Sequence, residues 1–316
     1  MAGILTLWAA LWLTGCATPQ MSQLQQDFPV KASAPSLLVR AALDGVPFFP
    51  QDDYQCGPAA LAMLAQHAGA VVRPDELTAQ VFVPGRQGAF TVEMLAAARR
   101  QALLAYPLRP RLEDVLREVA SGNPVLVFQN LSLPVYPVWH YAVVIGYDRD
   151  RNTVTLRSGV TERLQMSLFT FERTWARGNH WAMVALSPAS LPATAQPDSF
   201  MAAAAALERV QPAAAQAAYA TALQVWPGQR AALLGLGNTA YAQGRMDEAA
   251  LRFASATREH ADFADAWNNL AQVLLEQGRL KEAADAIAQA IGIGGVRAES
   301  YRSLQAQVEL QRQAGP

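Results

Sequence analysis

Residues 51–63 read Gln-Asp-Asp-Tyr-Gln-Cys-Gly-Pro-Ala-Ala-Leu-Ala-Met, and this stretch decides the fold of the first half of the chain. Cys56 stands directly before Gly57-Pro58 and an Ala- and Leu-rich run. Proline is favoured in the first turn of a helix, because the N–H that it lacks would be unsatisfied there. The pattern therefore predicts a helix over residues 57–67, with Cys56 at or just before its first turn.

The predicted position of Cys56 indicates a reactive thiol. A helix N-terminus carries a positive potential, which lowers the pKa of a nearby thiol and makes the thiolate available near neutral pH. A buried structural cysteine does not require this location and is the alternative interpretation. The sequence favours Cys56 as a nucleophile.

A nucleophilic thiol needs a base, and the chain contains four histidines. His67 lies 11 residues along the same predicted helix, which places it about 16 Å from the thiol. His260 falls among the C-terminal helices. His140 opens the strongest β pattern, His-Tyr-Ala-Val-Val-Ile-Gly-Tyr over residues 140–147, and is the predicted partner. His180, just before another strand, is the second candidate.

Residues 37–186 mix helical and strand patterns. Helices are predicted at residues 57–67, 91–101 and 111–121, and strands at 124–128, 140–147, 153–157 and 181–186. With helices early and strands late, the region is expected to be an α+β domain. A Pro- and Ala-rich stretch over residues 187–198 lacks periodicity and is predicted to be an interdomain linker.

Residues 199–316 carry a repeat with a period of 34 residues. Gly244-Arg245 recurs as Gly278-Arg279, and Glu248-Ala249-Ala250 recurs as Glu282-Ala283-Ala284. A weaker first copy over residues 200–226 contains Ala215 and Ala222 at the matching positions. The period resembles that of tetratricopeptide repeats, which implies an all-α stack with a concave surface for a protein partner. An Ala-rich helical bundle with accidental periodicity is the alternative.

The composition limits the classes of function. The chain has 316 residues, 52% hydrophobic and 16% charged, with a net charge of −1. This favours a folded protein of two domains and argues against disorder and against nucleic-acid binding, which needs a basic surface. The four histidines and two cysteines lack the spacing of a zinc site, and no phosphate-binding loop motif occurs, so no metal and no cofactor is predicted.

The N-terminus indicates export. Residues 1–13 form an apolar run shorter than the roughly 20 residues that span a bilayer. Leu13-Thr14-Gly15-Cys16 follows and resembles the lipobox of bacterial lipoprotein signals. The resemblance implies a signal peptide over residues 1–16, an acylated Cys16 and a tether over residues 17–36. With Ala17 after the cysteine, it implies attachment to the outer membrane on its periplasmic side. An ordinary apolar helix is the alternative.

Two motifs together resemble a known family. Gln51-x₄-Cys56-Gly57-Pro58-Ala59-Ala60-Leu61 and the run that begins at His140 look like the papain-like cysteine peptidases of the bacteriocin-processing, double-glycine leader family, in its stand-alone form. The resemblance covers residues 46–186. It implies a papain-like fold, a peptide or protein substrate, Cys56 as nucleophile and His140 as general base and acid.

The same resemblance assigns two further residues. Gln51 would contribute to the oxyanion hole, with Gln55 as the nearer alternative, and each such donor is worth about 2.7–4 kcal/mol in acyl transfer. The family has an Asp after the histidine strand, where this sequence has Ser158. A serine can orient an imidazole but cannot stabilise its charged form as a carboxylate does. Asp148 and Asp150 lie nearby but fit a turn between two strands.

Three functions remain open from the sequence. The first is a lipid-anchored cysteine peptidase whose repeats recruit a substrate or partner. The second is a catalytically inactive peptidase fold that binds a protein partner, as the missing Asp would allow. The third is a thiol acyltransferase, in which the thioester passes to an amine instead of water.

Overall fold

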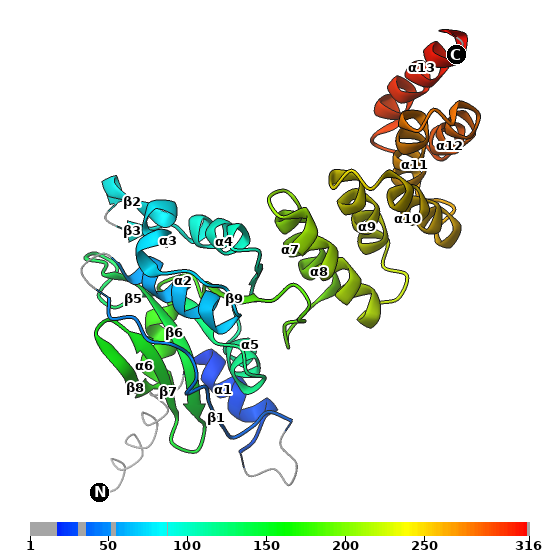
Figure 1. The fold of residues 1–316 in the computed structure, drawn as a ribbon. Helices are drawn as coiled ribbons and strands as arrows, with labels where there is room; N and C mark the ends of the chain where they lie inside the picture. The colour runs from blue at the N-terminus through cyan, green and yellow to red at the C-terminus, as the bar shows by residue number, and fades with distance from the viewer. Residues whose placement is uncertain (1–17, 31–35, 52–54, 87, 315–316) are drawn as a thin grey trace, which may run out of the picture. The chain divides into compact units, whose positions relative to one another are not determined.

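The computed structural model describes residues 18–30, 36–51, 55–86 and 88–314. They form two compact units, shown as a ribbon in Figure 1. The first unit comprises the residues up to Gln101, Ala105–Leu186 and Pro192–Thr194, and the second contains the C-terminal helices from Ala195 onward. Residues 1–17, with the predicted signal and Cys16, lie outside the described residues.

The first unit is built on one large β-sheet. In the described residues the strand order is β4-β9-β5-β6-β7-β8, and β1 pairs with Gly146–Asp148 of β6, beyond the residues that β5 pairs with. The ladders that join β5, β6, β7 and β8 are antiparallel. The strands are β1 (Arg40–Ala42), β4 (Leu104–Pro107), β5 (Val125–Asn130), β6 (Trp139–Asp148), β7 (Thr153–Ser158), β8 (Thr161–Ser167) and β9 (Ala182–Leu186).

Helix α2 (Cys56–His67) is the centre of this unit. All nine residues from Gly57 to Ala65 are buried, as expected for a helix that is apolar all round. It packs against β5, β6, β7 and β9 and against two neighbouring helices, α3 (Pro74–Val81) and α4 (Thr91–Arg100). A short two-stranded sheet, β2 (Phe82–Val83) with β3 (Gly88–Ala89), lies between those helices in the sequence.

The predicted α+β architecture is confirmed, but helices do not all precede strands, since β1 lies before α2 and α6 lies after β8. The predicted elements correspond to α2, α4, α5 (Leu112–Ala120), β5, β6, β7 and β9. The sequence patterns missed β1, α3, β4, β8 and α6 (Leu168–Ala176). Strand β8 is exposed at five of its seven positions and therefore lacks the apolar alternation that identifies a strand.

The N-terminal segment corrects one prediction. Residues 17–36 were expected to be a tether, but Pro19–Asp27 form helix α1, capped by the Thr18 hydroxyl. Gln20 ties α1 to the start of α5, since its side chain accepts from the Leu112 N–H and donates to the Pro110 carbonyl. Met21 and Leu24 are buried because α1 packs on α5 and α6.

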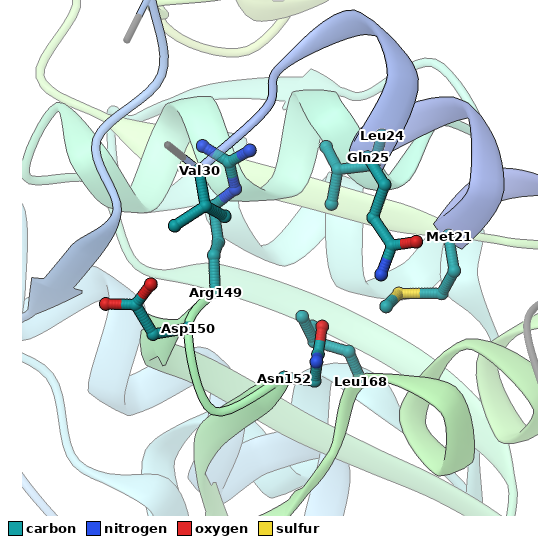
Figure 2. Close-up of a pocket in the computed structure, with 8 residues that line it drawn as sticks. All are labelled: Met21, Leu24, Gln25, Val30, Arg149, Asp150, Asn152 and Leu168. Atoms are coloured by element: carbon teal, nitrogen blue, oxygen red, sulfur yellow. The ribbon is translucent and has the colours of Figure 1, made fainter. Parts of the chain in front are cut away.

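A cavity of about 310 Å³ lies beneath α1. Figure 2 shows Met21, Leu24 and Gln25 of α1 opposite the turn between β6 and β7, which contributes Arg149 and Asp150. This turn is at the far end of β6 from His140. The cavity therefore lies away from the predicted catalytic residues.

The segment after β9 is held on the first unit. The Glu118 carboxylate is fully buried in α5 and accepts hydrogen bonds from the N–H groups of Ala193 and Thr194 and from the Thr194 hydroxyl. These bonds satisfy a buried charge. Part of the predicted linker is thus fixed in place, and the next helix begins at Pro197, inside the predicted linker.

The second unit consists of paired helices, as the 34-residue period predicts. Gly244 and Gly278, one period apart, both adopt a left-handed backbone (φ +72° and +73°) after a helix. Ala249 and Ala283 are fully buried at equivalent positions. The helices are α7 (Pro197–Glu208), α8 (Pro212–Val225), α9 (Arg230–Ala242), α10 (Met246–Glu259), α11 (Ala264–Glu276), α12 (Leu280–Ile293) and α13 (Ala298–Ala314).

The turn between α6 and β9 provides a test of the packing. A Cβ on Gly178 would lie 2.1 Å from the Phe128 carbonyl oxygen of β5, which is backbone and cannot rotate away. We expect Gly178→Ala to lower the free energy of unfolding by about 2–3 kcal/mol, because overpacking forces the backbone to shift. Urea unfolding measures this loss. Gly45→Ala is the control, since nothing lies within 4 Å of that Cβ; equal stability of the two variants would contradict the packing.

Candidate active site

Cys56 is the first residue of α2, at the position predicted for the nucleophile. Gly57 allows this end of the helix to approach the sheet closely. A Cβ on Gly57 would lie 3.0 Å from the Ala89 Cβ and 3.6 Å from the Tyr141 ring. The thiol is therefore brought to the start of β6 by the packing of α2.

The backbone of Tyr141 binds the Cys56 thiol. Pairing between β6 and β7 ends at Val143 and Arg157, so it does not reach Tyr141, two residues nearer the start of β6. At Tyr141 the backbone forms a hydrogen bond with the thiol. Tyr141 directly follows His140, so this bond lies one residue along β6 from the residue predicted as the base.

His140 is held by Ser158. The His140 Nε2 and the Ser158 Oγ are 2.9 Å apart, across the gap where β6 and β7 separate. Both side chains are partly buried. The structure thus brings together two of the residues singled out by the sequence, and it leaves the other ring nitrogen, Nδ1, outside this bond.

Gln51 is fixed to the turn that follows Ser158. Its backbone N–H donates to the Gly159 carbonyl at 3.1 Å, and its side-chain oxygen accepts from the Gly159 N–H at 3.0 Å. Gly159 has φ +58°, a left-handed conformation that favours glycine. The side chain of Gln51 is 7% exposed, and its Nε2 has no partner among the described residues. A buried, unused donor is the group that an oxyanion hole requires.

Arg157 holds the segment that leads to Gln51. This arginine is buried on β7 and donates to the Val46 carbonyl at 2.6 Å and to the Glu162 carbonyl at 2.7 Å. Its guanidinium also lies 5.8 Å from the centre of the Phe48 ring. These contacts attach residues 46–48 to β7, next to Ser158.

The ionisation of Cys56 differs from the prediction. Burial raises the pKa of the thiol, and backbone hydrogen bonds from Tyr141, Gly57 and Cys56 itself only partly oppose it. The expectation that the helix N-terminus would lower this pKa is wrong, because desolvation is the larger effect. Burial also lowers the pKa of His140 to about 4. The site therefore holds a neutral thiol and a neutral imidazole at neutral pH.

No hydrogen bond joins the Cys56 thiol to the His140 imidazole in the part of the chain that the structure describes. Catalytic hydrogen bonds are often long before substrate binds. The Cys56 thiol instead meets the backbone of Tyr141, the residue that follows His140.

The remaining sequence candidates lie elsewhere. Gln55 accepts from the Thr78 hydroxyl on α3 at 2.9 Å. His67 is the last residue of α2 and bonds to the Gly122 carbonyl, as expected for a residue that ends the helix. His180 is 3.0 Å from the buried Glu172 on α6, and His260 bonds to the Gly228 carbonyl in the second unit.

Neither nearby aspartate orients His140. Asp148 lies 3.0 Å and Asp150 2.9 Å from Arg40 of the β1 strand. Asp150 lies in the turn between β6 and β7, as predicted, whereas Asp148 is the last residue of β6; both are eight or more residues along from His140. That separation is about 26 Å in an extended strand.

Three positioning residues were not identified from the sequence: Tyr141, Arg157 and Gly159. Gly159 follows a strand pattern and is a turn signal that could have been noticed. The roles of Tyr141 and Arg157 depend on pairing between distant segments. Their residue types alone carry no such signal.

Within the described residues, no group of three or more His, Cys, Asp or Glu side chains is arranged to hold a metal ion. The described helices also include none that is long and apolar enough to cross a membrane.

Comparison with known families identifies both units. A Peptidase_C39-like family model matches residues 43–180, and two tetratricopeptide-repeat models match residues 206–262 and 240–297. The chain thus contains a C39 peptidase-like domain followed by tetratricopeptide repeats. The family and the repeats predicted from the sequence are confirmed. No curated protein matches the chain.

Solved structures similar to this chain have low identity. A C39-like peptidase from Bacillus anthracis is 20% identical, with a TM-score of 0.40, covering 46% of this chain and 97% of that one. The peptidase domain of Streptococcus ComA, a bifunctional ABC transporter of a quorum-sensing pathway, is 19% identical, with a TM-score of 0.37. The match covers 45% of this chain and 98% of that domain. The Sgt2 tetratricopeptide-repeat domain from Aspergillus fumigatus is 22% identical, with a TM-score of 0.34. The match covers 39% of this chain and 86% of that domain.

The lowered pKa of His140 has a measurable effect on stability. Its ordinary value is 6.5 and its folded value is about 4, so between these pH values the unfolded chain binds a proton that the folded chain does not. The contribution of His140 to the free energy of unfolding is complete above pH 6.5. It declines as the pH falls toward 4, by at most about 3 kcal/mol. We expect the stability of wild type to fall more steeply than that of His140→Gln across this window. Urea unfolding at pH 4–7 tests this, and parallel curves would contradict the burial of a neutral His140.

Proposed function

We propose that the chain is a cysteine peptidase that hydrolyses peptide bonds through a thioester on Cys56. The observation that best supports this proposal is the arrangement around β6. Its Tyr141 N–H meets the Cys56 thiol, while Ser158 holds the ring of the preceding His140. A C39 peptidase-like domain provides the matching family.

The chemistry begins from neutral groups. The Cys56 sulfur attacks the carbonyl carbon of the scissile bond as His140 takes the thiol proton. His140 then gives this proton to the leaving amine, and a thioester remains. Water, deprotonated by His140, attacks the thioester carbonyl and restores the thiol.

Ser158 sets the orientation and tautomer of the base. We assign its hydroxyl as the acceptor from the Nε2–H of His140, which leaves Nδ1 unprotonated and able to accept a proton. Since Ser158 carries no charge, it stabilises the imidazolium less than a carboxylate would. Proton transfer therefore accompanies attack and does not precede it.

Gln51 stabilises the developing oxyanion. Its oxygen is occupied by Gly159, so its amide group is oriented and its Nε2 remains available. A preorganised donor is more effective in a buried site than in water. The backbone N–H at the first turn of α2 supplies the second donor.

A binding scaffold without catalysis is the second candidate. It is favoured by Ser158 in place of a carboxylate and by the lack of a direct bond between the described Cys56 and His140 side chains. In either case the repeats recruit a substrate or protein partner.

A peptide library generated from a whole proteome tests the activity, with new N-termini detected by mass spectrometry. We expect cleavage by residues 17–316 and none by Cys56→Ala. Gln51→Ala should lower kcat about 10²–10³-fold through loss of the oxyanion donor. Gln55→Ala is the matched control, with less than a ten-fold effect because Gln55 binds Thr78. Cleavage that persists in Cys56→Ala rejects the mechanism, and no cleavage by wild type supports the scaffold.

The proposed location is the cell envelope, with acylated Cys16 anchoring the protein to the periplasmic side of the outer membrane. The support is the sequence up to Cys16. Each buried CH₂ of an acyl chain contributes about 0.8 kcal/mol to membrane affinity. We expect labelled palmitate to be incorporated in bacteria that express the wild type and not in those that express Cys16→Ser, which should be released from membranes. Equal membrane association of both would contradict the anchor.

A further inference from the structure

A cavity of about 370 Å³ lies within the second unit, among the helices of the repeats. Its lining combines one carboxylate, a phenol and four amide side chains with the apolar side chains of Ala242, Phe253 and Val273. Lys, Arg and His do not contribute to it. The lining residues are Glu208, Asn238, Tyr241, Ala242, Phe253, Asn268, Asn269, Gln272 and Val273.

Two carboxylates beside this cavity are held by neutral partners. The Tyr219 hydroxyl donates to Glu208 at 2.6 Å, and the Tyr241 hydroxyl donates to Glu276 at 2.6 Å. Gln272, a lining residue, also donates to Glu276 at 2.6 Å. These bonds orient the carboxylates but do not neutralise them, so both negative charges remain at the cavity.

Several other carboxylates of the repeats are paired with arginine. Glu248 forms ion pairs with Arg245 and Arg252, and Glu282 pairs with Arg279 at 2.5 Å. Residues 197–314 are described without a gap, and within them neither Glu208 nor Glu276 has an ion pair. The two carboxylates at the cavity are thus bonded to tyrosine hydroxyls and not to arginine.

The amides add further acceptors. Asn268 donates to the Asn269 side chain at 3.2 Å, and Asn269 donates to Asn238 at 3.0 Å. The Asn268 Oδ1 is buried and has no partner among the described residues. A buried acceptor without a donor costs free energy, and a donor supplied by a ligand would remove that cost.

We propose that this cavity binds a lysine or arginine side chain of a partner polypeptide. The cationic group lies between the carboxylates of Glu208 and Glu276, where its N–H donors meet carboxylate and amide oxygens. The aliphatic part of the side chain packs on Phe253 and Val273. Charge complementarity identifies the occupant, because an acidic segment would be repelled.

Fluorescence anisotropy with labelled 12-residue peptides tests the proposal. Three pools share random Ala, Ser, Gly and Leu flanks and differ only in two central residues, which are Lys, Gln or Glu. Their ends are acetylated and amidated, so that no terminal charge contributes. The full chain carries Cys56→Ala to prevent cleavage, which makes the result independent of the proposed peptidase activity.

We expect the Lys pool to bind at least ten-fold more tightly than the Gln pool, and the Glu pool not to bind. Glu208→Gln with Glu276→Gln should weaken binding of the Lys pool at least ten-fold, because glutamine keeps the tyrosine bonds but removes both charges. Glu248→Gln with Glu282→Gln, an equal change at two arginine-paired sites, should alter it less than two-fold. No binding of the Lys pool, equal binding of the Lys and Gln pools, or an equal effect of Glu248→Gln with Glu282→Gln overturns the proposal.

Discussion

The close packing of the N-terminus of α2 against the start of β6 is the constraint on which the candidate site depends. Gly57 permits it, since any larger residue meets Ala89 and Tyr141. The result is a hydrogen bond between the Tyr141 backbone and the Cys56 thiol. Two elements far apart in the sequence are thereby joined at the position where the chemistry is proposed.

The separation of β6 and β7 makes room for this bond. Beyond Val143 and Arg157 the two strands are no longer paired. Ser158 then reaches His140, and Gly159 holds Gln51, while Arg157 fixes the segment before Gln51 from the same strand. One end of β7 thus positions both the base and the proposed oxyanion donor. The same burial that assembles these groups keeps the thiol and imidazole neutral.

Local sequence signals predicted the elements that carry the site. The Cys-Gly-Pro sequence identified the start of α2, and the apolar run after His140 identified β6. Long-range effects were not predictable, because the bond between Gln51 and Gly159 joins residues 108 positions apart. The direction of the Cys56 pKa was wrong for the same reason, since the packed fold determines the desolvation of the thiol. Helix α1 was missed because its residues are mostly polar and its buried face needs α5 and α6.

The pairing of Cys56 with His140 is the central claim, and the pH dependence of thiol alkylation tests it most directly. In residues 17–316 Cys56 is the only cysteine, so the rate with iodoacetamide reports on this thiol alone. If a neutral imidazole assists the thiol, we expect a plateau in rate from about pH 5 to pH 8, which is lost in His140→Ala. Identical profiles for wild type and variant, both rising only as the thiol ionises, would show that the two side chains do not act together.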